Sequence, residues 1–221
     1  MSARVYLRDV RRYWPRRRSG LPAGQRVLDV FPRFADDPRR PPPEAPADPT
    51  LTIRRAAGDE RLVPVSDLVG SEAAVDRTVD FHCVTTWSVR DQTWTGVPVR
   101  AWWDSTIGPA GHQAVFVTDD LFADDVLLAW GLNGEPLDHR HGAPLRLVSP
   151  AQYGYKNVKH VQRIELCAER PVGTLGAKEH LRARVAEEER HSRWPAWLVR
   201  WPYRILVPVT AIAAEHSARQ R

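Results

Sequence analysis

Cys83 is the residue of this sequence whose chemistry depends most on its surroundings. It lies in the stretch 79–84, where apolar and polar residues alternate as in a strand, and at a strand end its side chain can point into a cleft. A thiolate there is a soft metal ligand, whereas a thiol is a small buried hydrophobe, and the residue alone favours the second interpretation. Cys167 is 84 positions away, a spacing typical of neither zinc sites nor disulfide frameworks, which predicts separate thiols in a reducing compartment.

Other sequence patterns that carry chemistry are missing. His139 and His141 are close enough for a metal pair, but no cysteine or carboxylate stands at a usable spacing, so we expect no metal site there. The sequence has no G-x-G-x-x-G, no P-loop, no H-E-x-x-H and no serine-centred elbow. Dinucleotide, nucleoside triphosphate and simple zinc chemistry therefore have no support.

Five ordered blocks of sequence carry a family resemblance. They are residues 81–88 with 94–99, then 115–118, 127–137, 141–148 and 153–159. As a set, they closely resemble the molybdopterin-binding domain of the sulfite oxidase superfamily, over roughly residues 60–168. Five blocks in the family's order are far more specific than one tetrapeptide.

The resemblance implies a molybdenum–molybdopterin cofactor, with Cys83 as the thiolate ligand to the metal and the residue that tunes it. A soft thiolate suits a metal already held by the sulfurs of a dithiolene. Arg146 and Lys159 match positions that contact the cofactor, and both side chains suit its phosphate. The resemblance assigns further cofactor contacts to Thr118, His141, Asn157 and Val158. Gly142 and Gly154 would allow the backbone to approach the cofactor closely. His82 is either a further hydrogen-bond donor beside Cys83 or an outward-facing strand residue.

The chain also departs from the family pattern. Sulfite oxidases proper carry an arginine soon after the ligating cysteine, whereas here residues 84–88 read Val-Thr-Thr-Trp-Ser. This resembles the branch of methionine sulfoxide reductase catalytic subunits and uncharacterised bacterial oxidoreductases. The connection 119–126 is shorter than in relatives, so we expect an open pocket or one rebuilt by the C-terminal tail. No haem block, iron–sulfur cysteine set or immunoglobulin-like domain is present, which indicates a separate electron-transfer partner and allows a monomer.

The implied function is oxygen-atom transfer to or from a small S- or N-oxide type substrate by a cytoplasmic, bacterial oxidoreductase. Two alternatives remain open. One is a non-catalytic protein of the same fold that binds the cofactor and serves in an assembly. The other is a basic module that binds nucleic acid or an anionic membrane, which we rank last because it leaves the five blocks unexplained.

The elements that must position these residues predict an α+β fold, with mixed β-sheets and short helices. We expect a basic, Pro-rich N-terminal arm over residues 1–50, the molybdopterin-binding domain over 51–170 and a helical, aromatic tail over 171–221. Strands are predicted at 51–53, 79–84, 114–117, 145–148 and 161–166, and 124–132 fits either a strand or a helix. Ser66 is a candidate helix cap, and 178–193 is predicted to be an exposed helix.

Charge and hydropathy indicate whether the chain binds nucleic acid or a membrane. The net charge is +5, and seven arginines against one aspartate fall within the first eighteen residues. We expect this start to be a solvated terminus and do not expect nucleic-acid binding. The longest apolar stretch, 205–214, contains Pro208 and is too short to span a bilayer, so no transmembrane segment is expected. The aromatic stretch 194–203 either binds a membrane interface or a partner, or folds back on the core, and we favour the last.

Overall fold

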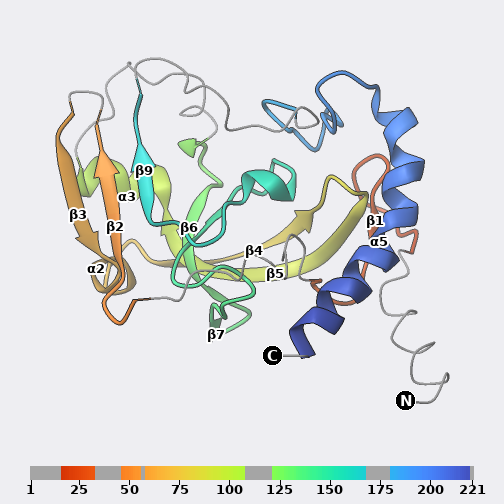
Figure 1. The fold of residues 1–221 in the computed structure, drawn as a ribbon. Coiled ribbons are helices and arrows are strands. Elements are labelled where there is room, and N and C mark those ends of the chain that lie inside the picture. The colour runs from red at the N-terminus through yellow and green to blue at the C-terminus, as the bar shows by residue number, and fades with distance from the viewer. Residues whose placement is uncertain (1–15, 33–45, 56–57, 108–120, 168–179, 220–221) are drawn as a thin grey trace.

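Two mixed β-sheets dominate the computed structural model, which describes residues 16–32, 46–55, 58–107, 121–167 and 180–219 (Figure 1). The larger sheet comprises β1 (Arg26–Val27), β4 (Val75–His82), β5 (Trp87–Pro98), β6 (Leu127–Leu132), β7 (Glu135–Pro136) and β8 (Arg146–Val148). β1 runs parallel to β5, and the other pairs are antiparallel. The smaller sheet has the order β3 (Glu60–Pro64), β2 (Thr50–Arg54), β9 (Arg163–Glu165), with β2 and β9 parallel.

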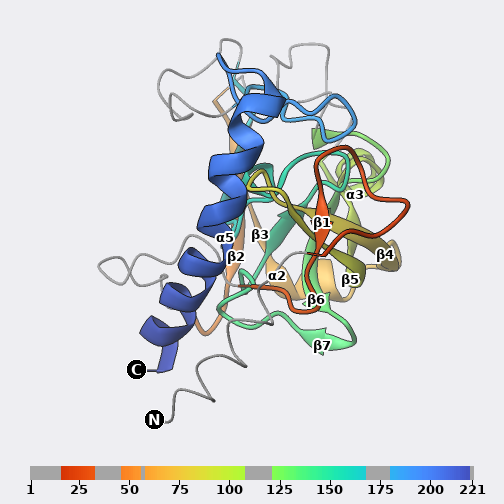
Figure 2. The same cartoon turned by 90° about the vertical axis from the view of Figure 1, so that its right-hand side faces the viewer.

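The helices are short except the last one. They are α2 (Val65–Val69), α3 (Val99–Thr106), the 3-10 turn η1 (Gly154–Lys156) and α5 (Ala196–Arg219). In Figure 1 the three-stranded sheet and α5 lie at opposite ends of the long β4–β5 hairpin, and Figure 2 shows the molecule from the α5 side. The predicted α+β class with mixed sheets, short helices and a C-terminal helix is therefore confirmed. None of the described helices, α5 included, combines the length and apolar character that a membrane crossing requires.

The main core fills the space between the two sheets. Leu51 and Ile53 alternate with exposed or half-exposed neighbours along β2, as a strand with one buried face requires. Their side chains join a cluster that includes Trp102 and Trp103 of α3 and Leu128 of β6. The long hairpin extends beyond this core, and its far end is packed by a second apolar cluster that includes Trp87 and Val89.

Most of the predicted strands are present. The stretches 51–53, 79–84, 145–148 and 161–166 correspond to β2, β4, β8 and β9, and the ambiguous stretch 124–132 contains the strand β6. The predicted strand 114–117 lies outside the described residues. Part of the predicted N-terminal arm joins the larger sheet, because β1 pairs with Trp87 and Ser88 of β5. The proposed boundaries at 50 and 170 stay predictions.

Two local predictions are wrong. Ser66 does not cap α2, whose N-cap is Pro64, and no side chain bonds to that end. Residues 180–193 do not form a helix. Their backbone pairs instead with the loop before η1, where Tyr153 N–H donates to Ala183 O (2.9 Å) and Val185 N–H donates to Ala151 O (3.0 Å). Ala183 and Val185 are buried against that loop, so tertiary pairing overrides the helical spacing of the apolar residues.

Candidate cofactor site

The loop that joins β4 to β5 carries Cys83. Cys83 directly follows the last residue of β4, and its backbone N–H donates to Trp87 O (2.8 Å), which closes the hairpin. Thr86 completes the turn with a positive φ of 76° and donates its N–H to Cys83 O (3.1 Å). The predicted placement of Cys83 at a strand end is confirmed, and a tight turn fixes the direction of its side chain.

Burial sets the protonation of the groups around this loop. Burial raises the pKa of the Cys83 thiol, and this effect exceeds the opposing influence of the Thr85 hydroxyl, 3.2 Å from the sulfur. His82 lies beside Ser88, with 2.8 Å between Nδ1 and the hydroxyl, and burial lowers the pKa of its imidazole. His82 is therefore not an outward-facing strand residue. The raised pKa favours the thiol form of Cys83, and a bound metal would favour its thiolate.

Arg146 is the most unusual charge in the structure. Its guanidinium lies 5.2 Å from the ring of Phe81 and 5.1 Å from that of Trp94. Nη1 donates to His141 O (2.9 Å), but Nε is buried without a hydrogen-bond partner. Among the described residues no carboxylate pairs with this cation, and burial lowers the pKa of Arg146 to about 10. A buried cation without an acid indicates a place for an anion.

His141 and Lys159 lie beside Arg146. Burial lowers the pKa of His141, and the charges of Arg146 and Lys159 lower it further, whereas Asp138 opposes both effects. His141 Nδ1 is 2.8 Å from Asp138 Oδ1, and Nε2 is buried with no partner. Lys159 packs against Gly142, whose φ is +112°, and its ammonium donates to Arg140 O (2.8 Å). The structure thus brings three predicted cofactor residues, Arg146, His141 and Lys159, into one positively charged corner.

Aromatic rings connect this corner to the Cys83 loop. Phe81 packs 4.7 Å from the ring of Phe31, and both rings contact the apolar cluster that reaches Cys83. Phe31 also lies 5.1 Å from the His141 ring and 5.6 Å from the Arg146 guanidinium. Sequence reasoning did not assign Phe31 to the site. The signal available was the short apolar stretch 27–31 within an otherwise polar, Pro-rich segment.

The remaining predicted residues have different roles or no described position. Asn157 is buried and holds the loop, because its Oδ1 accepts from Ser149 N–H (2.8 Å) and its Nδ2 donates to Ser149 O (3.3 Å). The Val158 side chain is exposed, and its carbonyl accepts from Leu147 N–H (2.9 Å). These bonds position the segment that leads to Lys159. Thr118 lies outside the described residues.

The residues present fit an anionic cofactor. Arg146 Nε is a buried donor and His141 Nε2 a buried ring nitrogen, and neither has a hydrogen-bond partner among the described residues. Cys83 supplies a soft donor next to the same aromatic cluster. Val207 of α5 packs into that cluster too, so the C-terminal helix reaches the surroundings of Cys83. A set of residues of these kinds would suit an anionic cofactor whose metal accepts a sulfur ligand.

Comparison with known proteins identifies the domain. Residues 106–175 match the family described as the oxidoreductase molybdopterin-binding domain. This match agrees with the family resemblance of the sequence blocks. Six of the predicted cofactor residues fall within the matched range, whereas Cys83 precedes it.

Individual relatives agree with this family. The protein-methionine-sulfoxide reductase catalytic subunit MsrP of Gluconobacter oxydans (strain 621H) is 32% identical over 177 residues, covering 66% of this chain and 56% of that protein. The uncharacterized oxidoreductase YuiH of Bacillus subtilis (strain 168) is 35% identical over 105 residues, covering 42% and 53%. The chain thus spans about half the length of these relatives. The sulfane dehydrogenase SoxCD from Paracoccus pantotrophus aligns with a TM-score of 0.49 at 19% identity, over 62% of this chain and 43% of that one.

Proposed function

We propose that this chain is a molybdenum–molybdopterin oxidoreductase that transfers an oxygen atom to or from a small S- or N-oxide type substrate. The observation that carries the proposal is the buried Arg146 guanidinium, unpaired among the described acids, on the aromatic cluster that also contacts Cys83. The homologous MsrP proteins are named as methionine sulfoxide reductases, which makes a sulfoxide the first substrate to test.

The residues of the candidate site would have different roles toward the cofactor. Arg146 and Lys159 would hold the anionic part of the cofactor, and His141 Nε2, an acceptor in the neutral imidazole, would bond to an N–H group elsewhere on the cofactor. Cys83 would be the protein's ligand to molybdenum. When bound, the metal centre supplies two-electron oxygen-atom transfer. The aromatic rings of Phe31 and Phe81 exclude water from the Arg146 side of the site, which strengthens its interaction with an anion.

Electrons would come from or pass to a separate partner. The relatives named MsrP are described as catalytic subunits, which supports a partner for this chain as well. Both cysteines, Cys83 and Cys167, are free thiols, and we propose a reducing compartment, the cytoplasm, as the location.

The test is to purify the full chain from a molybdenum-replete host and to measure metal and pterin content and sulfoxide reduction with an artificial electron donor. We expect about one molybdenum per chain. Cys83→Ser should retain pterin but lose turnover by at least about a hundredfold. Cys167→Ser, which removes the other partly buried thiol, should behave like the native chain.

The outcomes separate the alternatives. Bound molybdenum without turnover of sulfoxides, sulfite, nitrate or N-oxides would favour a non-catalytic cofactor-binding protein, the alternative that the short connection 119–126 suggests. If the purified chain contained neither metal nor pterin, and Cys83→Ser were indistinguishable from it, the proposal would be wrong.

A further inference from the structure

The start of α5 presents a stripe of exposed apolar side chains. Trp194, Trp197, Leu198, Trp201 and Ile205 follow one another at intervals of one, three or four residues, which places them along one side of the helix and the turn before it. Trp197 and Trp201 are each 66% exposed and Ile205 is 67% exposed. Water-soluble surfaces rarely keep so much aligned apolar area without a partner. The opposite side of α5 is packed, since Val207 is fully buried.

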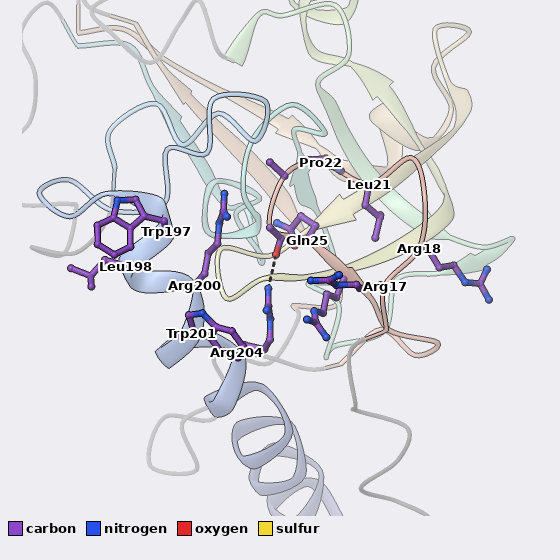
Figure 3. Close-up of a pocket in the computed structure, with 13 residues that line it drawn as sticks. Arg17, Arg18, Leu21, Pro22, Gln25, Trp197, Leu198, Arg200, Trp201 and Arg204 are labelled. Atoms are coloured by element: carbon purple, nitrogen blue, oxygen red, sulfur yellow. Dashed lines mark hydrogen bonds between the residues drawn. The ribbon is translucent and has the colours of Figure 1, made fainter.

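A cluster of arginines borders this stripe. A cavity of about 820 Å³ lies between the segment 17–26 and α5, and its walls include Arg17, Arg18, Arg26, Arg200 and Arg204. None of the described residues that line the cavity is acidic. In Figure 3, Arg200 and Arg204 extend from α5 toward the loop at Gln25, while Trp197 and Leu198 point away from it. Cationic and apolar side chains therefore flank each other on one face.

The residues that the structure describes neutralise only part of this charge. Arg200 Nε donates to Glu188 (3.1 Å), and Arg204 Nη2 donates to the carbonyl of Gly24 (3.3 Å), which brings no charge. Burial lowers the pKa of Arg204, and repulsion by Arg26 and Arg17 lowers it further. The cluster of like charges is stabilised when an anion approaches.

We propose that α5 and the segment 17–26 together bind the surface of an anionic bilayer, with the helix in the plane of the interface. The indoles and Ile205 enter the boundary between headgroups and acyl chains, and the arginines contact lipid phosphates. Tryptophan interleaved with arginine is the composition that this boundary favours. An acidic protein or a nucleic acid would account for the arginines but not for an apolar stripe that runs over the twelve residues from Trp194 to Ile205.

The test is sedimentation of the full chain with vesicles of phosphatidylcholine alone or with about a third phosphatidylglycerol. We expect at least about tenfold tighter binding to the anionic vesicles and weakening as salt is raised. Brominated lipid should quench tryptophan fluorescence of the bound chain. Equal binding to both vesicles, or no quenching, would overturn the proposal.

Matched variants assign the binding to this face. Trp197→Ala with Trp201→Ala should weaken binding at least about tenfold and should keep the helix, since alanine favours it. Leu62→Ala removes an equally exposed apolar side chain of β3 and should bind as the native chain does. Arg17→Gln with Arg18→Gln should weaken binding roughly twenty-five-fold, about fivefold for each arginine. Arg54→Gln with Arg55→Gln makes the same charge change at the end of β2 and the residue after it, and should have no effect.

Two further results would count against a membrane. Native-like vesicle binding by the tryptophan double variant, with an unchanged circular dichroism spectrum, would show that the stripe does not insert. Salt-sensitive binding to an acidic peptide or a nucleic acid, without vesicle binding, would assign the arginines to a macromolecular polyanion instead.

Discussion

The buried charge of Arg146 does not stabilise the cofactor-free protein, but it would stabilise a bound anion. It loses its hydration beneath aromatic rings and gains one hydrogen bond, to His141 O. We therefore expect Arg146→Met to change the free energy of unfolding of the cofactor-free protein by less than about 1 kcal/mol, because an apolar side chain replaces a desolvated charge. In the same variant, the cofactor content per chain should fall at least about tenfold. Urea unfolding and molybdenum analysis measure the two effects. A destabilisation above roughly 2 kcal/mol would instead make Arg146 a structural residue.

His141 should make stability depend on pH. In the neutral imidazole, Nδ1–H donates to Asp138, which leaves Nε2 as an acceptor. Because burial lowers the pKa of His141, the unfolded chain binds a proton at a higher pH than the folded chain does. Stability therefore falls as pH drops below about 6.5, by at most about 1.4 kcal/mol per pH unit for this group.

His141→Asn should remove that slope and keep cofactor binding, since an amide also offers an acceptor. His82 and His160 have lowered pKa values too, but they are present in both proteins, so the difference between the two unfolding profiles from pH 7 to 5 belongs to His141. Identical profiles would show that the imidazole does not titrate in this range.

At the scale of elements, η1 rests directly on β4. A Cβ built on Gly154 would lie 2.4 Å from the ring of Phe81, and that ring is held by Phe31 and Trp87. Gly154→Ala should therefore push η1 away from the sheet and lower the free energy of unfolding by about 1–3 kcal/mol. Gly70→Ala is the control, because its Cβ would meet only a carbonyl at 3.4 Å. Equal melting temperatures for the two variants would contradict this packing argument.

How far sequence could predict each element depended on what pairs with it. The strand that ends before Cys83 was predictable because apolar and polar residues alternate along the second half of β4. The stretch 124–132 was ambiguous, since a short buried apolar run fits a strand or a helix. Residues 180–193 had helical spacing at Leu181 and Val185, yet their backbone pairs with a loop about thirty residues earlier, which no local pattern reveals. The length of α5 could not be predicted, because Pro202 and Pro208 lie inside it and proline usually ends a helix.

The candidate site was predictable to the same extent. Arg146, His141 and Lys159 could be named from motif resemblance, and the structure brings them together. Phe31 could not, because its contact with His141 joins positions 110 apart through the parallel pairing of β1 with β5. Such pairing depends on the whole sheet and leaves only an isolated apolar stretch in the sequence.

At the scale of the whole molecule, Arg190 joins three parts of the chain that are distant in sequence. Its side chain is fully buried, and it donates to Val84 O (2.8 Å), in the Cys83 loop, and to Ala23 O (3.1 Å), in the segment before β1. The guanidinium also lies 4.8 Å from the ring of Tyr153 and pairs with Glu188. Glu188 in turn binds Arg200 of α5. Arg190 and Glu188 thus connect the Cys83 loop, the segment before β1 and the last helix.

Arg190→Met should therefore act on all three parts at once. Two carbonyls lose their donor and Glu188 loses one partner, and we expect the free energy of unfolding to fall by about 3 kcal/mol. Amide hydrogen exchange should become faster in residues 17–28, 83–87 and 180–204 together. Arg184→Met is the control: this arginine is exposed and pairs with Glu187, so its loss should cost less than about 1 kcal/mol. Faster exchange confined to 180–193 would mean that Arg190 holds only its own segment, and that the Cys83 loop is positioned by the hairpin turn alone.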